Sequence, residues 1–402
     1  MTSAAEILRV ETTQASEGAT LVTAQALANE FAKTAVERDR RGGTAKRERD
    51  LLRQSGLLRL SIPAALGGAE ASWPEVLQAV RLLGRADGSL AHLFGFHHLL
   101  LATVRLFGTP AQWEPLLRDT AERAWFWGNA LNPLDTRTSI VRRDGVWRVN
   151  GTKSFCSGSV DSDMLVISAL RAEGGKLAVT AIPTARAGVR VIPDWDAMGQ
   201  RQTDSGSVEL RDVRIEDAEL LETPGPLGSV FASLRPCLAQ LILANVFLGI
   251  AEGAVAEAKR YTRSQKRAWA ASGVDSALRD PYVLAHYGEL HLELLSARAL
   301  TDAAAHELQA AWRQGEQLSP QQRGETALAI AAAKVATTRA GLDAATRIFE
   351  VMGARATRAD AGLDRFWRNL RTHTLHDPVD YKLRELGELA LNDSLPTPSF
   401  YT

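Results

Sequence analysis

The hydrophobic pattern of this chain changes period twice, and this constrains the fold more than any other feature. From about residue 19 to residue 123, apolar residues recur three and four positions apart, as on one face of a helix. From about Trp125 to Glu222 the period is two and β-branched residues are frequent, which predicts strands. After Pro224 and Gly225 long helical patterns return. Helices, then strands, then helices is an uncommon order.

These changes of pattern predict a mainly α protein with a β middle domain. We expect an N-terminal helical domain over 1–123, with a tail of about 18 residues, and a middle domain over 124–224. A C-terminal four-helix bundle should occupy 225–402. The pair Asp144-Gly145 predicts a hairpin, because both residues tolerate the positive φ of a type I′ turn, and we expect the middle domain to be antiparallel. The four bundle helices are expected over about 228–269, 282–316, 320–352 and 365–392.

The composition of the chain limits the kinds of molecule that it is expected to bind. The chain carries 47 basic and 47 acidic residues, so no overall field attracts it to nucleic acid or to an anionic membrane. The start has no signal-peptide pattern, and no run of about 18 apolar residues predicts a membrane span. Cys156 and Cys237 have no zinc-type spacing and favour a reduced, cytoplasmic protein. We expect a small, apolar ligand.

Four stretches carry a resemblance to a known family. They are GLLRLSIP with LGG (56–68), NGTKSFCSGSVDSDMLVISAL (150–170), DWDAMGQRQTDSGSVELRDVRI (194–215) and LDRFWRNLRTHTLHDP (363–378). In order and spacing they resemble the acyl-CoA dehydrogenase superfamily. The resemblance implies that superfamily's fold: an N-terminal helical domain, an antiparallel β barrel or sandwich, and a C-terminal four-helix bundle.

Shorter stretches resemble one branch, the reduced-flavin-dependent dibenzothiophene monooxygenases. These stretches are HLFGFHH (92–98), WFWGNALNPLD (125–135), KSFCSG (153–158), GQRQTDSG (199–206), MGAR (352–355) and RTHTLHDP (371–378). Such enzymes take reduced FMN from a separate reductase, react it with oxygen to a C4a-hydroperoxyflavin, and transfer one oxygen atom to a soft centre. The resemblance implies a two-component monooxygenase of an apolar organosulfur substrate (dibenzothiophene-like, or a sulfide or sulfone), assembled as a homotetramer.

The stretch KSFCSG is expected to hold the flavin ring. Phe155 and Ser157 are two residues apart and would point to the same face of a strand. The resemblance implies that Ser157 stabilises the hydroperoxide near flavin N5 and that Phe155 lines the ring. From the spacing alone, a packing pair with a surface hydroxyl is the commoner arrangement.

The stretch WFWGNALNP resembles a loop whose backbone binds flavin. Gly128 would allow a close approach, and the amide of Asn129 both donates and accepts hydrogen bonds. Trp127 and Asn132 belong to the same expected contact. Tryptophans beside a glycine could instead fill the core, which is their commoner use.

Further cofactor contacts are implied elsewhere in the chain. Trp195 and Ser205 resemble flavin-edge residues of the same branch. Arg267, with Trp269 beside it, and Arg355 are candidates for the FMN phosphate, because a planar guanidinium binds phosphate with two bonds. Both arginines could instead be surface charges. Members of the superfamily that use FAD often carry QxxGGxG where this chain has EVMGARAT, so FMN is favoured and FAD is the alternative.

The run LHDP stands where acyl-CoA dehydrogenases of the commoner type present a glutamate base. Here His376 and Asp377 occupy that place, and an imidazole is better suited to managing a proton near neutral pH. If His376 faces the flavin, it would keep the hydroperoxide protonated. If Asp377 faces it, acyl-CoA dehydrogenation with FAD is the alternative function, and a flavin-free binding relative is a third. His373 and His376 share a helix face, but no third ligand has suitable spacing, so no metal is expected.

The resemblance implies that the stretch HLFGFHH forms a wall of the substrate pocket through His92 and Phe96, and Phe155 is a further candidate for this pocket. Gly95 costs about 1 kcal/mol in mid-helix relative to alanine, which suggests that something approaches closely there. A histidine among apolar residues is, however, more often a satisfied core residue. The expected catalytic set is His376, Ser157, Asn129 and His92.

Overall fold

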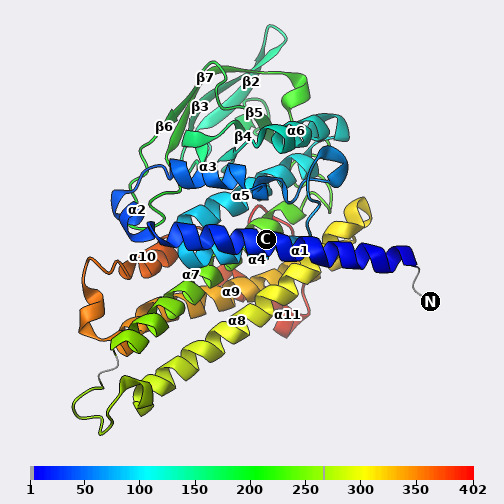
Figure 1. Cartoon of the computed structure of the whole chain (residues 1–402). Helices are drawn as coiled ribbons and strands as arrows, with labels where there is room; N and C mark the ends of the chain where they lie inside the picture. The colour runs from blue at the N-terminus through cyan, green and yellow to red at the C-terminus, as the bar shows by residue number, and fades with distance from the viewer. Residues whose placement is uncertain (1–3, 266–267) are drawn as a thin grey trace.

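The computed structural model describes residues 4–265 and 268–402, and it stacks the chain in three parts. A sheet lies at one end, the N-terminal helices lie beneath it, and the long C-terminal helices form the other end (Figure 1). Helix α5 (Gly88–Phe107) contacts strand β1 (Trp127–Ala130) and helix α7 (Leu234–Gln265). The central helix α5 is therefore the element on which both the sheet and the bundle are built.

The N-terminal part is helical from its first described residue. The residues expected to form a tail instead continue α1 back to Ala4, because no proline interrupts the helical pattern there. Two expected helix starts are present: the Ser72 side chain accepts from the Glu75 backbone, and Thr109 forms a capping box with Gln112. The other helices here are α2 (Ala35–Arg41), α3 (Lys46–Gln54), α4 (Trp73–Ala86) and α6 (Pro110–Arg123).

The middle domain is a mixed sheet, and the expectation of a purely antiparallel one was wrong. Strand β4 (Met164–Arg171) pairs in parallel with β1 and β2 (Thr138–Arg143), because the segment between Lys153 and Met164 crosses back instead of turning tightly. The hairpin at Asp144-Gly145 is confirmed, with positive φ at both residues. The sheet order is β1-β4-β2-β3-β7-β6, with β5 on β4. The remaining strands are β3 (Val146–Lys153), β5 (Leu177–Pro183), β6 (Val189–Ile192) and β7 (Ser207–Ile215).

The C-terminal part is the expected bundle with one change. The helix predicted over 365–392 is broken between His373 and Asp380. Pro378 lies in the break, where its missing N–H and its ring would disrupt a continuous helix. His376 and Asp377 therefore sit on a connection between two helices. The helices are α7, α8 (Pro281–Gln314), α9 (Pro320–Met352), α10 (Asp364–His373) and α11 (Asp380–Asn392).

Helices α5 and α7 pack at very short range. A Cβ added to Gly95 would lie 2.5 Å from Cγ2 of Ile242, so the expected close approach at this glycine is the backbone of α5 meeting a side chain of α7. Both helices are long and apolar enough to span a membrane, but 94% of each apolar window is buried inside the protein. They are the core on which the candidate site rests.

Candidate active site

Ser157 lies in a loop and not on a strand. Strand β3 ends at Lys153, and Phe155 adopts a left-handed φ of +59°, so the two side chains do not share a strand face as the spacing suggested. Ser157 is buried, whereas the ring of Phe155 is 62% exposed. The Phe155 ring lies 6.1 Å from the ring of Trp195, centroid to centroid. The loop thus presents a buried hydroxyl and an exposed Phe155 ring that faces the half-buried Trp195.

A chain of hydrogen bonds joins this loop to helix α10. The Oγ atoms of Ser157 and Ser205 are 2.7 Å apart, and Ser205 Oγ lies 2.7 Å from Thr203 Oγ1. Thr203 donates to the carbonyl of Gln200 at 2.9 Å, and the backbone N–H of Gln200 donates to Oδ1 of Asn369 at 2.7 Å. Ser157 and Ser205, both expected at the flavin, are therefore in direct contact, and their loops are fixed to the helix that leads to LHDP.

The stretches KSFCSG and RTHTLHDP also reach adjacent residues of α5. A Cβ on Gly158 would lie 3.2 Å from Cδ2 of Leu93, so the end of KSFCSG packs on that residue. The neighbouring His92 ring lies 4.6 Å from the ring of His373, at an interplanar angle of 76°. Two segments more than 200 residues apart in sequence thus converge on one turn of α5.

His92, Phe96 and His373 form a buried aromatic cluster. The rings of His92 and Phe96 are 4.0 Å apart, and the Nδ1 atoms of His92 and His373 are buried with no hydrogen-bond partner in the described chain. Burial lowers the pKa of His92 to about 3, with a smaller contribution from His376, and lowers the pKa of His373 well below its usual range. Both rings are neutral at physiological pH, and each keeps a buried nitrogen that no described residue uses.

His376 and Asp377 have different surroundings, which answers the question of which one is available. The His376 side chain is 39% exposed, whereas the Asp377 carboxylate is buried. Oδ1 of Asp377 lies 2.9 Å from Nδ1 of His376 and 3.4 Å from Nζ of Lys334. Lys334 also donates to Gln240 at 2.8 Å. Asp377 is the buried partner and His376 the accessible one.

The buried ion pair keeps Asp377 ionised. Burial by itself would raise the pKa of Asp377, but the hydrogen bond from His376 and the positive charge of Lys334 outweigh it and hold that pKa well below its usual range. Burial lowers the pKa of Lys334 to about 8, while Asp377 opposes this shift. A carboxylate held in this way is a weak base. Because an ionised carboxylate only accepts hydrogen bonds, Nδ1 of His376 carries the proton and Nε2 is directed elsewhere.

Only some residues of the stretch WFWGNALNP lie at the candidate site. The backbone N–H of Asn129 donates to the carbonyl of Ser157 at 2.9 Å, which places this residue beside the same loop, and its Oδ1 accepts from the Leu131 N–H at 3.2 Å. The Asn132 carbonyl accepts from Nζ of Lys153 at 3.0 Å, next to KSFCSG. Trp127 differs from expectation: its ring is buried in the core and its Nε1–H donates to Thr120 at 2.9 Å, so this side chain has the packing role.

Trp269 and Arg355 lie at the other end of the bundle from His373. Phe247, whose ring is 5.5 Å from that of His373, and Thr262, which bonds the carbonyl of Val351, are fifteen residues apart on α7, or about 22 Å. In Figure 1 this end of the bundle lies away from the sheet. Both side chains are exposed, and one subunit does not bring them to the histidine cluster. Arg267 lies outside the described residues.

Several residues at the site escaped the sequence analysis. Arg49 of α3 is fully buried, pairs with Asp204 at 3.0 Å and donates to the carbonyl of Gly158 at 2.9 Å, so it holds both loops that carry the serines. Burial lowers the pKa of Arg49 to about 10 and raises that of Asp204. Lys334 was likewise not identified, and His373 was considered only as a metal ligand. Arginine and lysine at ordinary helical spacing look like surface residues, and no local signal marks them as buried.

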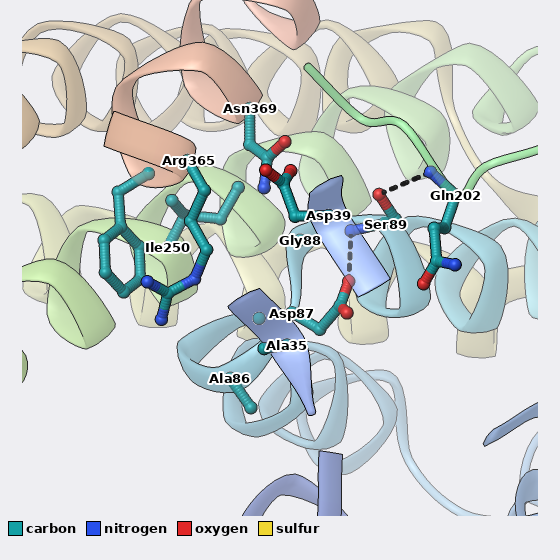
Figure 2. Close-up of a pocket in the computed structure, with 12 residues that line it drawn as sticks. Ala35, Asp39, Ala86, Asp87, Gly88, Ser89, Gln202, Ile250, Arg365 and Asn369 are labelled. Atoms are coloured by element: carbon teal, nitrogen blue, oxygen red, sulfur yellow. Dashed lines mark hydrogen bonds between the residues drawn. The ribbon is translucent and has the colours of Figure 1, made fainter. Parts of the chain in front are cut away.

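A small cavity borders the loop that carries Ser205. It lies between α2, α5 and α10, and Figure 2 shows Ser89 bonded to the backbone of Gln202 and to Asp87 along its wall. Its volume of about 10 Å³ is enough for one water molecule. The hydrogen bond between Ser89 and Gln202 on the cavity wall holds the loop that carries Ser205. The cavity itself is too small for a flavin.

The converging residues fit an isoalloxazine ring. Ser157, Ser205 and Asn129 supply hydroxyl and amide groups for a polar edge, and each is buried but not fully sealed. The exposed Phe155 and the half-buried Trp195 supply apolar surface beside them, and His92 and His373 each keep a buried Nδ1 without a hydrogen-bond partner in the described chain. Few polar groups among aromatic surfaces is the composition of a cofactor site.

Comparison with known proteins gives consistent matches. Family models of the acyl-CoA dehydrogenase N-terminal, middle and C-terminal domains match residues 19–124, 128–213 and 241–381. A probable FMNH2-dependent monooxygenase from Pseudomonas putida is 57% identical over 95% of this chain and 97% of its own length. A dibenzothiophene monooxygenase from Mycolicibacterium goodii is 44% identical over 94% of each.

Two solved structures are also similar. The methanesulfinate monooxygenase of Pseudomonas fluorescens has a TM-score of 0.94 and 57% identity, covering 95% of this chain and 99% of that one. The dibenzothiophene monooxygenase of Paenibacillus sp. A11-2, solved with FMN and indole, has a TM-score of 0.91 and 44% identity, covering 95% and 100%. The expected fold of three domains is confirmed by these matches.

Proposed function

The chain belongs to the acyl-CoA dehydrogenase family, and we propose that it is a two-component monooxygenase that uses reduced FMN and oxygen to oxygenate an organosulfur compound. Relatives that are 42% to 57% identical along nearly the whole chain are named as a probable FMNH2-dependent monooxygenase, a dibenzothiophene monooxygenase and a methanesulfinate monooxygenase. The observation that carries the proposal is the convergence of the Ser157 loop and the histidine cluster of His92, His373 and His376 on one turn of α5.

Bound reduced FMN would supply the oxygen chemistry by activating O2 and delivering one oxygen atom. Ser157 and Asn129 would bind the polar edge of the ring, and Phe155 and Trp195 would cover its surface. His376 would accept a proton at Nε2 and return it there, because its Nδ1–H is held by Asp377. Lys334 keeps Asp377 ionised and so fixes this tautomer. The neutral rings of His92 and His373 add no charge to the site.

The substrate would lie against α5. His92 and Phe96 present adjacent rings there, and a small molecule with an apolar body fits such a wall. A separate flavin reductase would supply reduced FMN by diffusion or a transient contact. We place the enzyme in the cytoplasm, where both buried cysteines would stay reduced and where reduced flavin is produced.

A homotetramer completes the proposal. Arg355 and Trp269 are too far from His376 in one subunit to contact the same FMN, so a second subunit would bring them to the phosphate, together with Arg267. The outer face of α8 exposes Leu292 and Leu295, as an interface helix would.

Acyl-CoA dehydrogenation is less compatible with the site. It requires Asp377 to remove a proton from the substrate, but that carboxylate is buried and paired with Lys334. An acyl-CoA that bleaches FAD bound in place of FMN would support this activity. Failure to bind either redox state of flavin at micromolar concentration would instead support a flavin-free binding protein.

His376→Ala tests the proposal. The variant, supplied with reduced FMN, air and dibenzothiophene or methanesulfinate, should lose at least about 100-fold in product formation, the usual effect of removing a general acid or base. Flavin binding and the circular dichroism spectrum should stay unchanged. The exposed His306 on α8 gives the matched control, His306→Ala, which should retain full activity. An unchanged rate in His376→Ala would remove this residue from the mechanism.

A further inference from the structure

Arg235, near the start of α7, is a buried guanidinium without an acidic partner. The residue is 7% exposed, and its Nε donates to Oγ1 of Thr103 at 3.2 Å. Among residues 4–265 and 268–402, no carboxylate forms an ion pair with it and no acceptor bonds its Nη atoms. An unpaired charge in a protein interior is costly, so such a group normally serves a ligand.

The two Nη groups of Arg235 are unpaired in the described chain and are not completely sealed. Arg323 on α9 shows the contrast: it is 1% exposed, bonds Ser233 at 3.0 Å and 2.9 Å, and its Nη1 is a sealed polar atom. The Nη atoms of Arg235 lack a partner in the described chain but are not sealed in this way. The Nη atoms therefore keep some accessible surface although the side chain as a whole is buried.

Arg235 is attached to the face of α5 that carries His92 and Phe96. His92, Phe96 and Thr103 lie on one face of α5, because they are separated by close to whole helical turns. Thr103 is seven residues beyond Phe96, about 10 Å along the axis, and its hydroxyl holds Arg235. The guanidinium thus stands at the far end of the wall that begins at His92.

Tyr401 lies near the His376 ring and within electrostatic reach of Arg235. Its ring lies 6.3 Å from the His376 ring. Burial and the charge of Asp377 raise the pKa of Tyr401, while Arg235 lowers it, so the neutral phenol lies within the electrostatic reach of both groups. The carboxylates near Tyr401 are already paired, Asp377 with Lys334 and Glu385 with Lys382. None of them neutralises Arg235.

We propose that Arg235 binds the acid group of the substrate, which is therefore an organosulfur oxyanion, with an alkanesulfinate as the simplest case, and not a neutral thiophene. The inference rests on the proposed monooxygenase function. A guanidinium offers two parallel N–H groups to two oxygens of one acid group, and its charge offsets theirs. The apolar part of the substrate would face Phe96.

The overall reaction balances for this substrate. A sulfinate, R–SO2−, with O2 and FMNH2 gives the sulfonate R–SO3−, FMN and H2O. One oxygen atom forms the new S–O bond, the other leaves as water with the two hydrogens of FMNH2, and sulfur is oxidised by two electrons. The net charge of the organic acid is unchanged, so Arg235 binds substrate and product alike.

Binding to the flavin-free protein tests this directly. Methanesulfinate and its neutral analogue dimethyl sulfone are titrated calorimetrically into the wild type, Arg235→Met and Arg235→Lys. Arg235→Met should lose at least tenfold in methanesulfinate affinity, roughly the effect of one charge-assisted hydrogen bond. Dimethyl sulfone affinity should change less than twofold, and Arg235→Lys should retain part of the sulfinate affinity. The exposed Arg313 provides the control Arg313→Met, which should bind methanesulfinate as the wild type does.

Turnover separates this inference from the function on which it rests. With reduced FMN and air, Arg235→Met should lose kcat/KM for methanesulfinate mainly through KM, while consumption of reduced FMN without substrate stays the same. Equal sulfinate affinity in wild type and Arg235→Met, or no sulfinate binding by the wild type, overturns the role of Arg235. If the wild type then still oxygenates dibenzothiophene, the monooxygenase proposal stands; if it oxygenates no sulfur compound, that proposal fails too. Should Arg235→Met not fold, Arg235→Lys decides by the same two titrations.

Discussion

Lys334 and Asp377 form an ion pair inside the bundle, with 3.4 Å between Nζ and Oδ1. The lysine is 1% exposed, and the aspartate accepts a 2.9 Å hydrogen bond from Nδ1 of the accessible His376. A charge on α9 therefore determines which nitrogen of a histidine between α10 and α11 is free. Lys334 is a positioning residue and does not itself reach the flavin.

Lys334→Met should change the pH dependence of oxygenation. The pKa of Lys334 is lowered to about 8, so its charge is present below about pH 8 and lost above it. We expect wild-type kcat to fall as the pH rises through 8, and the variant to lack this decline at a lower overall rate. Removing one partner of a buried pair destabilises a protein by about 3–5 kcal/mol, so the double variant Lys334→Met, Asp377→Asn serves as the folded control. An alkaline decline that persists in both variants would assign it to another group.

Ser157→Ala should shorten the lifetime of the oxygenated flavin without weakening flavin binding. The substitution removes a hydroxyl that contacts Ser205 at 2.7 Å, while the backbone bond to Asn129 stays. Stopped-flow absorbance after mixing reduced FMN–protein with oxygen measures the decay, and fluorescence titration measures FMN affinity. Ser139→Ala, on the exposed face of β2, is the control. Loss of folding, with the lifetime unchanged in the folded fraction, would show that Ser157 only packs.

The buried histidines of α5 should make the protein sensitive to acid. Burial lowers the pKa of His97 to about 4 and that of His92 to about 3, against an unfolded value near 6.5. The unfolded chain thus binds more protons, and the free energy of unfolding should fall as the pH drops from 6.5 toward 4, by up to about 1.4 kcal/mol per pH unit for each histidine. Urea titrations between pH 7.5 and 5 measure this slope. His97→Gln should reduce it by one proton and the exposed His306→Gln should not; equal slopes would contradict the assignment.

Mixing two inactive variants tests whether the flavin site is shared between subunits. If one subunit provides His376 and another Arg355, randomly assembled hybrids of His376→Ala and Arg355→Ala contain intact sites at roughly one in four. Subunits exchanged by mild denaturation and refolding should regain that share of wild-type turnover, while each variant treated alone should not. A mixture no more active than its components would place both residues in the same subunit's site or outside it.

The family resemblance predicted that KSFCSG and RTHTLHDP lie at one location, because motif order along a known fold carries three-dimensional information, and both stretches reach adjacent residues of α5. Local spacing was less reliable. Phe155 has a left-handed φ although it is not a glycine, and no residue in the sequence signals this conformation. The alternation of side chains along a strand therefore gave the wrong direction for the Phe155 side chain. The predicted last helix continued through Pro378, where the chain leaves the helix and exposes His376.

Buried charge was the other feature that the sequence concealed. Lys334 and Arg235 occur in apolar helices at positions that any solvated lysine or arginine could hold, and only the packing of α5, α7 and α9 around them shows that they are enclosed. Trp127 shows the opposite error, since its ring stabilises the core instead of lining the cofactor site. Which side of an element meets a neighbour depends on tertiary packing, which is absent from the local pattern.

The contact between Gly95 and Ile242 has a consequence for anyone redesigning this enzyme. Helices α5 and α7 can approach this closely only because Gly95 has no side chain. Even alanine at Gly95 would push the two helices apart and would displace His92, Phe96 and Thr103 together. Libraries aimed at new sulfur substrates should diversify Phe96 or Arg235 and keep Gly95. The pocket side chains depend on a fixed distance between α5 and α7, and any larger residue at Gly95 would change that distance.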